Sequence, residues 1–145
     1  MIIKTVKTAG ELNDAYAVRR EVFVNEQRVP ASVEKDEHDE KALHVIAYEG
    51  ETPIGAGRLR IDGKAGKVER LCVKKAYRNK GVGRKMMAYI EDVARTLHLH
   101  QLNLHAQIDA QHFYQQFGYK SYSDLFYEAG MPHVAMKKGL NNQAR

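Results

Sequence analysis

The sequence is poor in cysteine and has no long hydrophobic run, and each absence excludes a class of protein. Cys72 is the only cysteine, so no disulfide can form within the chain and a cysteine-rich zinc site is excluded. No apolar stretch approaches the roughly 20 residues of a membrane-spanning helix, so we expect no membrane partner. Residues 1–6 lack the charged head, apolar run and cleavage site of a signal peptide. We therefore expect a cytoplasmic protein.

Size and composition indicate a single globular domain. A chain of 145 residues can bury a substantial core, and a content of 43% hydrophobic and 28% charged residues argues against disorder. Repeats and low-complexity stretches are absent. We expect one domain over residues 1–140 and a disordered tail over residues 141–145.

The net charge of +5 is accompanied by an acidic segment, which contains Glu34, Asp36, Glu37, Asp39 and Glu40. This distribution is more typical of a solvated surface with one anion site than of a nucleic-acid-binding face. We therefore expect no nucleic-acid partner. The acidic segment could hold a hard cation, although it lacks EF-hand spacing, or attract a cationic amine, or be a solvated loop. The solvated loop fits best, and we expect no metal.

The apolar periodicity predicts strands interspersed with helices. Strands are expected over residues 2–7, 44–49, 53–61, 67–73, 101–106, 119–126 and 133–137. Strands joined by tight turns should be antiparallel, and the strand–helix–strand unit after residue 67 should be parallel and right-handed. The fold class is therefore α/β of the α+β type, a mixed sheet covered by helices.

Three helices are expected between these strands. Thr8 and Glu11 have the spacing of a capping box. The helix that follows should bury Leu12, Ala15, Tyr16, the stem of Arg19, Val22 and Phe23. A helix starting near Gly83 should bury Val82, Met86, Met87, Tyr89, Ile90, Val93, Ala94 and Leu97. A short third helix over residues 110–117 should end at Gly118.

The segment from Val68 to Lys85 predicts a strand, a basic loop with two glycines, and the start of a helix. Glycine allows positive φ, and a first helical turn presents unpaired N–H groups and partial positive charge. Such a junction binds anions, most often phosphate. The glycine pair alone is not specific, because it lacks the ending of a P-loop and the third glycine of a dinucleotide fingerprint. The candidate anion-binding residues are Arg78, Asn79, Lys80, Gly81, Val82, Gly83, Arg84 and Lys85.

Two motifs, in this order along the chain, resemble the GNAT superfamily of N-acetyltransferases. Arg78-x-x-Gly81-x-Gly83 is similar to the acyl-CoA signature of that family. Tyr114, four residues after Ala110 and four before Gly118, matches its helical tyrosine. The resemblance implies a mostly antiparallel central sheet of about six to seven strands flanked by helices. A splayed parallel pair in that sheet would form the acyl-CoA cleft.

The same resemblance assigns roles to individual residues. The loop amides would hold the pyrophosphate of coenzyme A, with acetyl-CoA as cosubstrate. The backbone of Leu71, Cys72 and Val73 would hydrogen-bond the pantetheine arm. Tyr114 would give a proton or a hydrogen bond to the departing thiolate, the alternative being a core tyrosine packed beside Phe113. Further cofactor contacts would come from Phe113 and Tyr114, and from Gln107, which replaces the asparagine of many relatives.

Acetyl transfer to an amine needs a general base, since an alkylammonium has a pKa near ~10. Glu69 is one candidate, and its alternative role is a salt bridge with Arg58 or Arg60. His105 is the other, and its alternative role is a hydrogen-bonded interior or edge histidine. Cys72 adjoins the expected thioester position, which suggests an acyl-enzyme, but a small buried residue is the preferred interpretation. The N–H of Cys72 or Val73 could polarise the thioester carbonyl.

Several motifs resemble a narrower bacterial branch, the ElaA- and YjcF-like proteins. They are Arg19-x-Glu21-Val22-Phe23-Val24-x-Glu26-Gln27, Asp36-x-x-Asp39, His44 and Ala129-Gly130-Met131-Pro132-His133. His44 and His133 are expected to fix loops. The resemblance implies an N-acetyltransferase that acts by direct attack of a primary amine in a ternary complex. A non-catalytic acyl-CoA-binding or regulatory domain is the alternative. The acceptor, a small-molecule or peptide amine, is not readable from the sequence, and a homodimer stays open.

Overall fold

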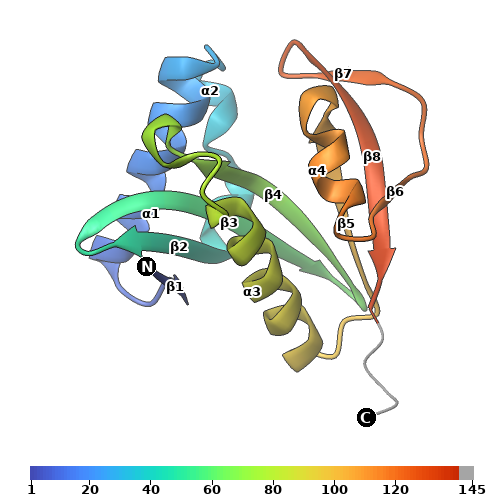
Figure 1. The fold of residues 1–145 in the computed structure, drawn as a ribbon, viewed down its shortest axis with the longest axis horizontal. Helices are drawn as coiled ribbons and strands as arrows, with labels where there is room; N and C mark the ends of the chain where they lie inside the picture. The colour runs from blue at the N-terminus through green and yellow to red at the C-terminus, as the bar shows by residue number, and fades with distance from the viewer. Residues whose placement is uncertain (141–145) are drawn as a thin grey trace.

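The computed structural model describes residues 1–140 (Figure 1), so the predicted tail lies outside the described residues. The strands are β1 (Ile2–Thr5), β2 (Leu43–Glu49), β3 (Thr52–Asp62), β4 (Ala65–Val73), β5 (Gln101–Gln107), β6 (Lys120–Ser121), β7 (Phe126–Glu128) and β8 (Met131–Gly139). The α-helices are α1 (Ala9–Arg19), α2 (Ala31–Glu34), α3 (Val82–Thr96) and α4 (Gln111–Gln115). A π-helix, η1 (Arg20–Glu26), continues α1, and η2 (Glu37–Glu40), η3 (Lys75–Tyr77) and η4 (Ile108–Ala110) are single 3-10 turns.

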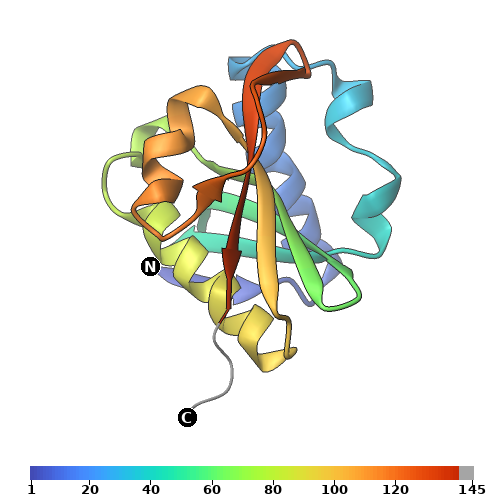
Figure 2. The same cartoon turned by 90° about the vertical axis from the view of Figure 1, so that its right-hand side faces the viewer.

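The eight strands of the described residues join one sheet of order β1-β2-β3-β4-β5-β8-β6, with β7 also paired to β8. Helices α1 and α3 cover its opposite faces (Figures 1 and 2). Because side chains alternate along a strand, Val45 and Ala47 pack in the core cluster under α3, whereas Ile46 packs in the cluster under α1. The predicted fold class, a mixed and mostly antiparallel sheet flanked by helices, is confirmed.

The first helix begins where the sequence predicts. Thr8 is its N-cap, and the Thr8 and Glu11 side chains make the reciprocal bonds of a capping box. The predicted burial of Arg19 was too limited, because the whole side chain is buried rather than its stem alone. Its guanidinium ends on two carboxylates, which supply the partners that a buried charge requires.

Helix α3 packs on the sheet through Met86, Met87, Ile90 and Ala94, as its periodicity predicts. The prediction was wrong for Leu97, which is 42% exposed because the helix ends at Thr96 and the chain turns away. The buried face of α3 also contains a charged residue, which the hydropathy pattern does not predict. Glu91 is buried and accepts hydrogen bonds from the Tyr119 hydroxyl and the Lys138 ammonium.

Within residues 1–140, β4 and β5 are the only parallel strand pair, and they are paired over a short stretch. Their register extends from Ala65 opposite Gln101 to Val68 opposite Leu104. Beyond Val68 the two strands separate into the two arms that Figure 1 shows rising from a common base. A bulge against β3 lies at the point of separation, where Arg70 adopts a φ of 59°. The predicted splayed pair is thereby confirmed.

The prediction of one continuous strand over residues 119–126 was wrong. Two short strands, β6 and β7, flank residues 122–125, so the sheet has eight strands rather than the expected six to seven. Ser123 explains the break, because its Oγ accepts the backbone N–H of Ala135 in place of a strand carbonyl. Among the described helices, none has the length and apolar character that crossing a membrane would require.

Candidate active site

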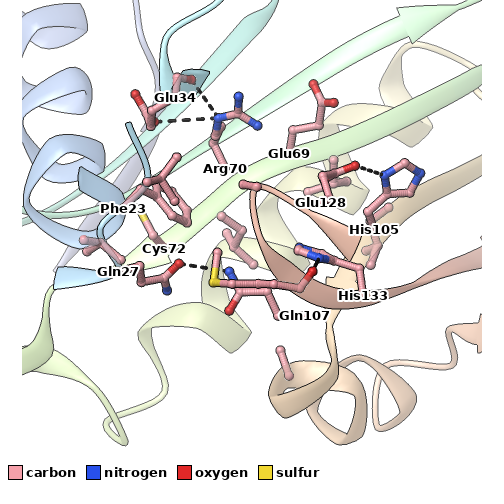
Figure 3. A pocket seen from close by; sticks show the side chains of 18 of the residues that line it. Phe23, Gln27, Glu34, Glu69, Arg70, Cys72, His105, Gln107, Glu128 and His133 are labelled. Carbon is pink, nitrogen blue, oxygen red and sulfur yellow. Dashed lines mark hydrogen bonds and ion pairs between the residues drawn. The ribbon is translucent and has the colours of Figure 1, made fainter. Parts of the chain in front are cut away.

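A cavity of about 560 Å³ lies between the separated arms of β4 and β5. One wall is β4 from Val68 to Val73, and the other is β5 from Leu104 to Gln107 together with the β7–β8 hairpin. Residues of η1 and α2, Phe23 among them, close the third side (Figure 3). The cavity therefore occupies the cleft that the sequence placed beside a splayed parallel pair.

The glycine loop forms the turn between β4 and α3. Gly81 is the N-cap of α3 with a φ of 83°, a left-handed conformation that disfavours any residue with a Cβ. In the described part of the chain no side chain caps this helix end, so its first N–H groups are available to a ligand. Gly83 packs beside Phe113, and a Cβ there would make an ordinary van der Waals contact, 3.4 Å from the Phe113 ring. The exposed side chains around the turn are Asn79, Lys80, Arg84 and Lys85.

Arg78 has a role that the motif alone does not reveal. Its two terminal nitrogens donate to the two oxygens of Glu26, each over 2.6 Å, and its Nε donates to the Val73 carbonyl over 2.8 Å. The guanidinium thus ties η1 to the end of β4. The positive charge next to the glycine turn is carried by the other basic side chains.

Cys72 lies on β4 and is buried under α1. Burial raises the pKa of its thiol to about 12, so the group stays protonated near neutral pH. A protonated thiol is a poor nucleophile. The structure therefore favours the interpretation of Cys72 as a small buried residue.

Tyr114 reaches the cavity from α4, on the side opposite β4. Its ring packs against Phe113 at 5.0 Å and Tyr119 at 6.0 Å between centroids. Burial raises the pKa of its phenol, so the hydroxyl keeps its hydrogen. Among the described residues no group forms a hydrogen bond with that hydroxyl, which leaves it free to donate to a ligand.

The carboxylate of Glu69, on β4, is held by three cations. Arg58 donates to it over 2.6 Å and Arg60 over 2.8 Å, and Lys67 lies 3.4 Å away. Burial alone would raise the pKa of Glu69, but the hydrogen bonds from the two arginines outweigh it, and the pKa lies below its usual value. The salt bridge that the sequence offered as the alternative role is present.

His105 lies on the opposite wall, at the end of β5. Its Nδ1 is 2.8 Å from Oε1 of Glu128, which comes from β7 (Figure 3). Both side chains line the cavity. The two base candidates thus occupy opposite walls, one saturated with cations and the other paired with a single carboxylate.

Gln107, at the position of the expected cofactor contact, spans the cleft. Its Nε2 donates to Oε1 of Gln27 over 3.0 Å, so the end of β5 is tied to η1 (Figure 3). His133 fixes the hairpin, as expected, through an Nδ1 that lies 2.7 Å from the Met131 carbonyl oxygen. His44 likewise holds the Asp39 carbonyl at 2.8 Å.

The acidic segment is not a solvated loop. Glu34 and Asp39 are buried, and Asp36 is half-buried. Arg19 donates to both Glu34 and Asp39 over 2.7 Å, and Arg58 donates to Asp36 and Asp39 over 2.7 and 2.9 Å. Over residues 1–140 no group of three or more metal-binding side chains is positioned to hold an ion. The buried carboxylates of this segment are thus paired with arginines, and these ion pairs anchor the wall of the cavity.

Comparison with known proteins agrees with this geometry. A family model described as the acetyltransferase (GNAT) domain matches residues 6–140. The chain belongs to the GNAT acetyltransferase family. The GNAT chain is 44% identical over 133 residues to an uncharacterized N-acetyltransferase of Bacillus subtilis, YjcF, with 91% of this chain and 95% of that protein covered.

Two solved GNAT-like structures share the fold. A putative N-acetyltransferase from Lactobacillus plantarum superposes with a TM-score of 0.91 at 31% identity, covering 97% of this chain and 98% of that one. ElaA from Escherichia coli superposes with a TM-score of 0.87 at 22% identity, covering 95% and 99%. The expected GNAT acyl-CoA N-acyltransferase with a YjcF-like relative is confirmed, and the chain shares its fold with ElaA.

The sequence did not assign a role to three members of this GNAT site. Arg70 donates to the Glu34 carbonyl and to Asp36, Glu26 holds Arg78, and Glu128 holds His105. No local spacing marks them, because their partners lie 23 to 52 residues away. The available sequence signal was the Glu26-Gln27 dipeptide, which belongs to a motif that resembles the ElaA- and YjcF-like proteins.

Proposed function

We propose that this protein transfers the acetyl group of acetyl-CoA to a primary amine of a small molecule or peptide, by direct attack in a ternary complex. The observation that carries the proposal is the cleft between β4 and β5. An uncapped helix end with a glycine turn lies beside it, and a buried tyrosine hydroxyl and two titratable pairs line it. A cytoplasmic location stays a prediction of the sequence, and a homodimer stays open.

The residues around the turn fit a pyrophosphate. The N–H groups at the start of α3 and the exposed Lys80, Arg84 and Lys85 would hold it, with Asn79 and Val82 completing the loop. The backbone of Leu71, Cys72 and Val73, which no longer pairs with β5, would bind the pantetheine arm. Phe113 lies against Gly83 at the same end.

The reaction moves one acyl group and two protons. The general base, Glu69 or His105, takes a proton from the acceptor ammonium, directly or through water. The freed nitrogen attacks the thioester carbonyl carbon, the C–N bond forms, and the C–S bond breaks. Tyr114, whose pKa is raised by burial, gives its proton to the leaving thiolate, and the second proton of the attacking nitrogen passes through water to restore the Tyr114 hydroxyl. The N–H of Cys72 or Val73 would stabilise the carbonyl oxygen as charge develops on it.

The test combines acetyl-CoA calorimetry with a screen of amines that monitors release of free thiol. We expect binding at tens of micromolar or tighter and thiol release with at least one amine. Binding without release for any amine would instead support a non-catalytic acyl-CoA-binding domain. Absence of binding would remove the basis of the proposal.

A further inference from the structure

The β7–β8 hairpin contributes a carboxylate to the wall of the cavity. Glu128 lies at the end of β7, and its Oε1 is 2.8 Å from the Nδ1 of His105 on β5 (Figure 3). A carboxylate can only accept, so Nδ1 of His105 carries the hydrogen and donates it. In the neutral imidazole the lone pair then resides on Nε2. Among the described residues no group bonds to that Nε2.

The same hairpin restricts the imidazole ring. The edge of Phe126 lies against His105 with centroids 5.0 Å apart and planes at 77°. Phe126 also stacks on His133 at 6.0 Å. His133 is fixed in turn by its bond to the Met131 carbonyl. A rotation of the His105 ring would therefore disturb both the carboxylate bond and the aromatic contact.

The charged groups near this imidazole are few. On β4, Lys67 and Glu69 face the same cavity, but Glu69 holds Lys67, Arg58 and Arg60. On β8, His133 is separated from His105 by Phe126. Glu128 is the charged side chain that contacts His105 within residues 1–140. A carboxylate already satisfied by three cations is a weak proton acceptor, whereas an imidazole with a free Nε2 is a suitable one.

We propose that His105 is the general base and that Glu128 is its positioning residue. This inference rests on the proposed function. The acceptor ammonium would give its proton to Nε2 of His105, while the Glu128 carboxylate keeps the hydrogen on Nδ1 and stabilises the imidazolium that forms. Glu128 itself takes up no proton. The amine nitrogen then holds the lone pair that attacks the thioester.

The decisive variant is Glu128→Gln, which keeps the shape and an accepting oxygen but removes the charge. Nitrogen-15 NMR of the histidine rings reports the tautomer of His105 without any acceptor. The dependence of kcat/KM on pH, measured with an amine from the screen, reports the base. In the unmodified protein we expect His105 to be protonated on Nδ1 when neutral. In Glu128→Gln we expect the plateau of kcat/KM to fall about 10-fold.

A purely structural role would give a different pattern. The two side chains are 28% and 47% exposed, so their ion pair adds little stability, and we expect the melting temperature to stay within about 2 °C. His105→Gln should lower kcat/KM by about 10²-fold or more with acetyl-CoA binding retained. The matched controls, Glu51→Gln in the β2–β3 turn and His100→Gln before β5, are exposed and should change neither profile nor tautomer.

The outcomes separate the two proposals. If the unmodified protein neither binds acetyl-CoA nor releases thiol, the proposed function fails. If it turns over but the Glu128→Gln profile superimposes on its own, the positioning role alone fails. A neutral His105 that is protonated on Nε2 in the unmodified protein would overturn the role of Glu128 even without an acceptor.

Discussion

Cys72 and Tyr114 line the same cleft, and burial raises the pKa of both side chains. The consequences for their chemistry differ. A thiol acts as a nucleophile only after losing its proton, so a pKa raised to about 12 removes Cys72 from nucleophilic chemistry. A phenol acts as an acid only while it keeps its proton, so a raised pKa preserves Tyr114 as a donor. One physical effect thus keeps both groups protonated, which disfavours Cys72 as a nucleophile and suits Tyr114 to donate a hydrogen.

Tyr114→Phe tests this reasoning. Loss of the hydroxyl should lower kcat by about 10²-fold, because the thiolate then departs without a proton. The acetyl-CoA dissociation constant should change little, since the ring and its contacts with Phe113 and Tyr119 remain. Tyr122→Phe, at a ring that is 52% exposed, is the matched control. An unchanged kcat in Tyr114→Phe would dismiss the acid role.

Asp39 gives the fold a dependence on acid. Burial would raise the pKa of its carboxyl, but the hydrogen bonds from Arg19 and Arg58 outweigh burial and hold it well below the ordinary value. A group with a folded pKa below that of the unfolded chain stabilises the fold above the unfolded value, about 3.9. This contribution is lost as the pH falls below that value toward the folded pKa. Thermal melts should therefore show falling stability from about pH 5 downward.

Asp39→Asn removes the charge that Arg19 and Arg58 share. We expect the free energy of unfolding at pH 7 to drop by about 3 kcal/mol, because two buried guanidiniums lose a partner. Melts between pH 3 and pH 7 should then depend less on pH than in the unmodified protein. The control is Asp62→Asn, at an exposed position at the end of β3. If both variants showed the same acid dependence, Asp39 would not be its source.

At the scale of elements, local patterns predicted what local forces determine. The capping box at Thr8, the apolar stripe of α3 and the alternation of β5 were all found, because each depends on neighbours within a few residues. The break between β6 and β7 was missed, since it follows from the Ser123 side chain replacing a strand carbonyl. A polar side chain of ordinary composition gives no periodic signal of such a replacement.

The glycine turn allows a prediction with an internal control. Gly81 and Gly50 have φ of +83° and +61°, and an added Cβ would meet open space at both. Alanine should therefore cost each position about 1 kcal/mol of backbone strain. Only Gly81→Ala lies at the N-cap of α3, so only that variant should weaken acetyl-CoA binding, by about 3- to 10-fold. Calorimetry and thermal melts on both variants measure these effects. Equal acetyl-CoA affinities of the two variants would show that the turn at Gly81 does not take part in binding the cofactor.

At the scale of the whole molecule, the N-terminal layer holds both arms of the cleft. Glu26 binds Arg78 next to the glycine turn, and Gln27 binds Gln107 at the end of β5. These contacts join residues 52 and 80 positions apart, so no window of sequence reveals them. The sequence could identify the family and the cleft, because those rest on motifs. The sequence could not show that Arg78 of the glycine-loop motif is ion-paired with Glu26, since that contact depends on how η1 packs beside β4.

The Glu26–Arg78 bridge implies that acetyl-CoA binding is opposed by a resident carboxylate. Glu26→Gln removes a negative charge that sits 2.6 Å from a guanidinium beside the proposed anion site. The uncompensated Arg78 should then attract the pyrophosphate, and the acetyl-CoA dissociation constant should fall about 2- to 5-fold at low salt. Because both side chains are partly exposed, the gain should vanish near ~0.5 M salt. The control, Glu37→Gln at an exposed position of η2, should show no gain. Weaker binding in Glu26→Gln would mean that the bridge orders the loop more than its charge repels the ligand.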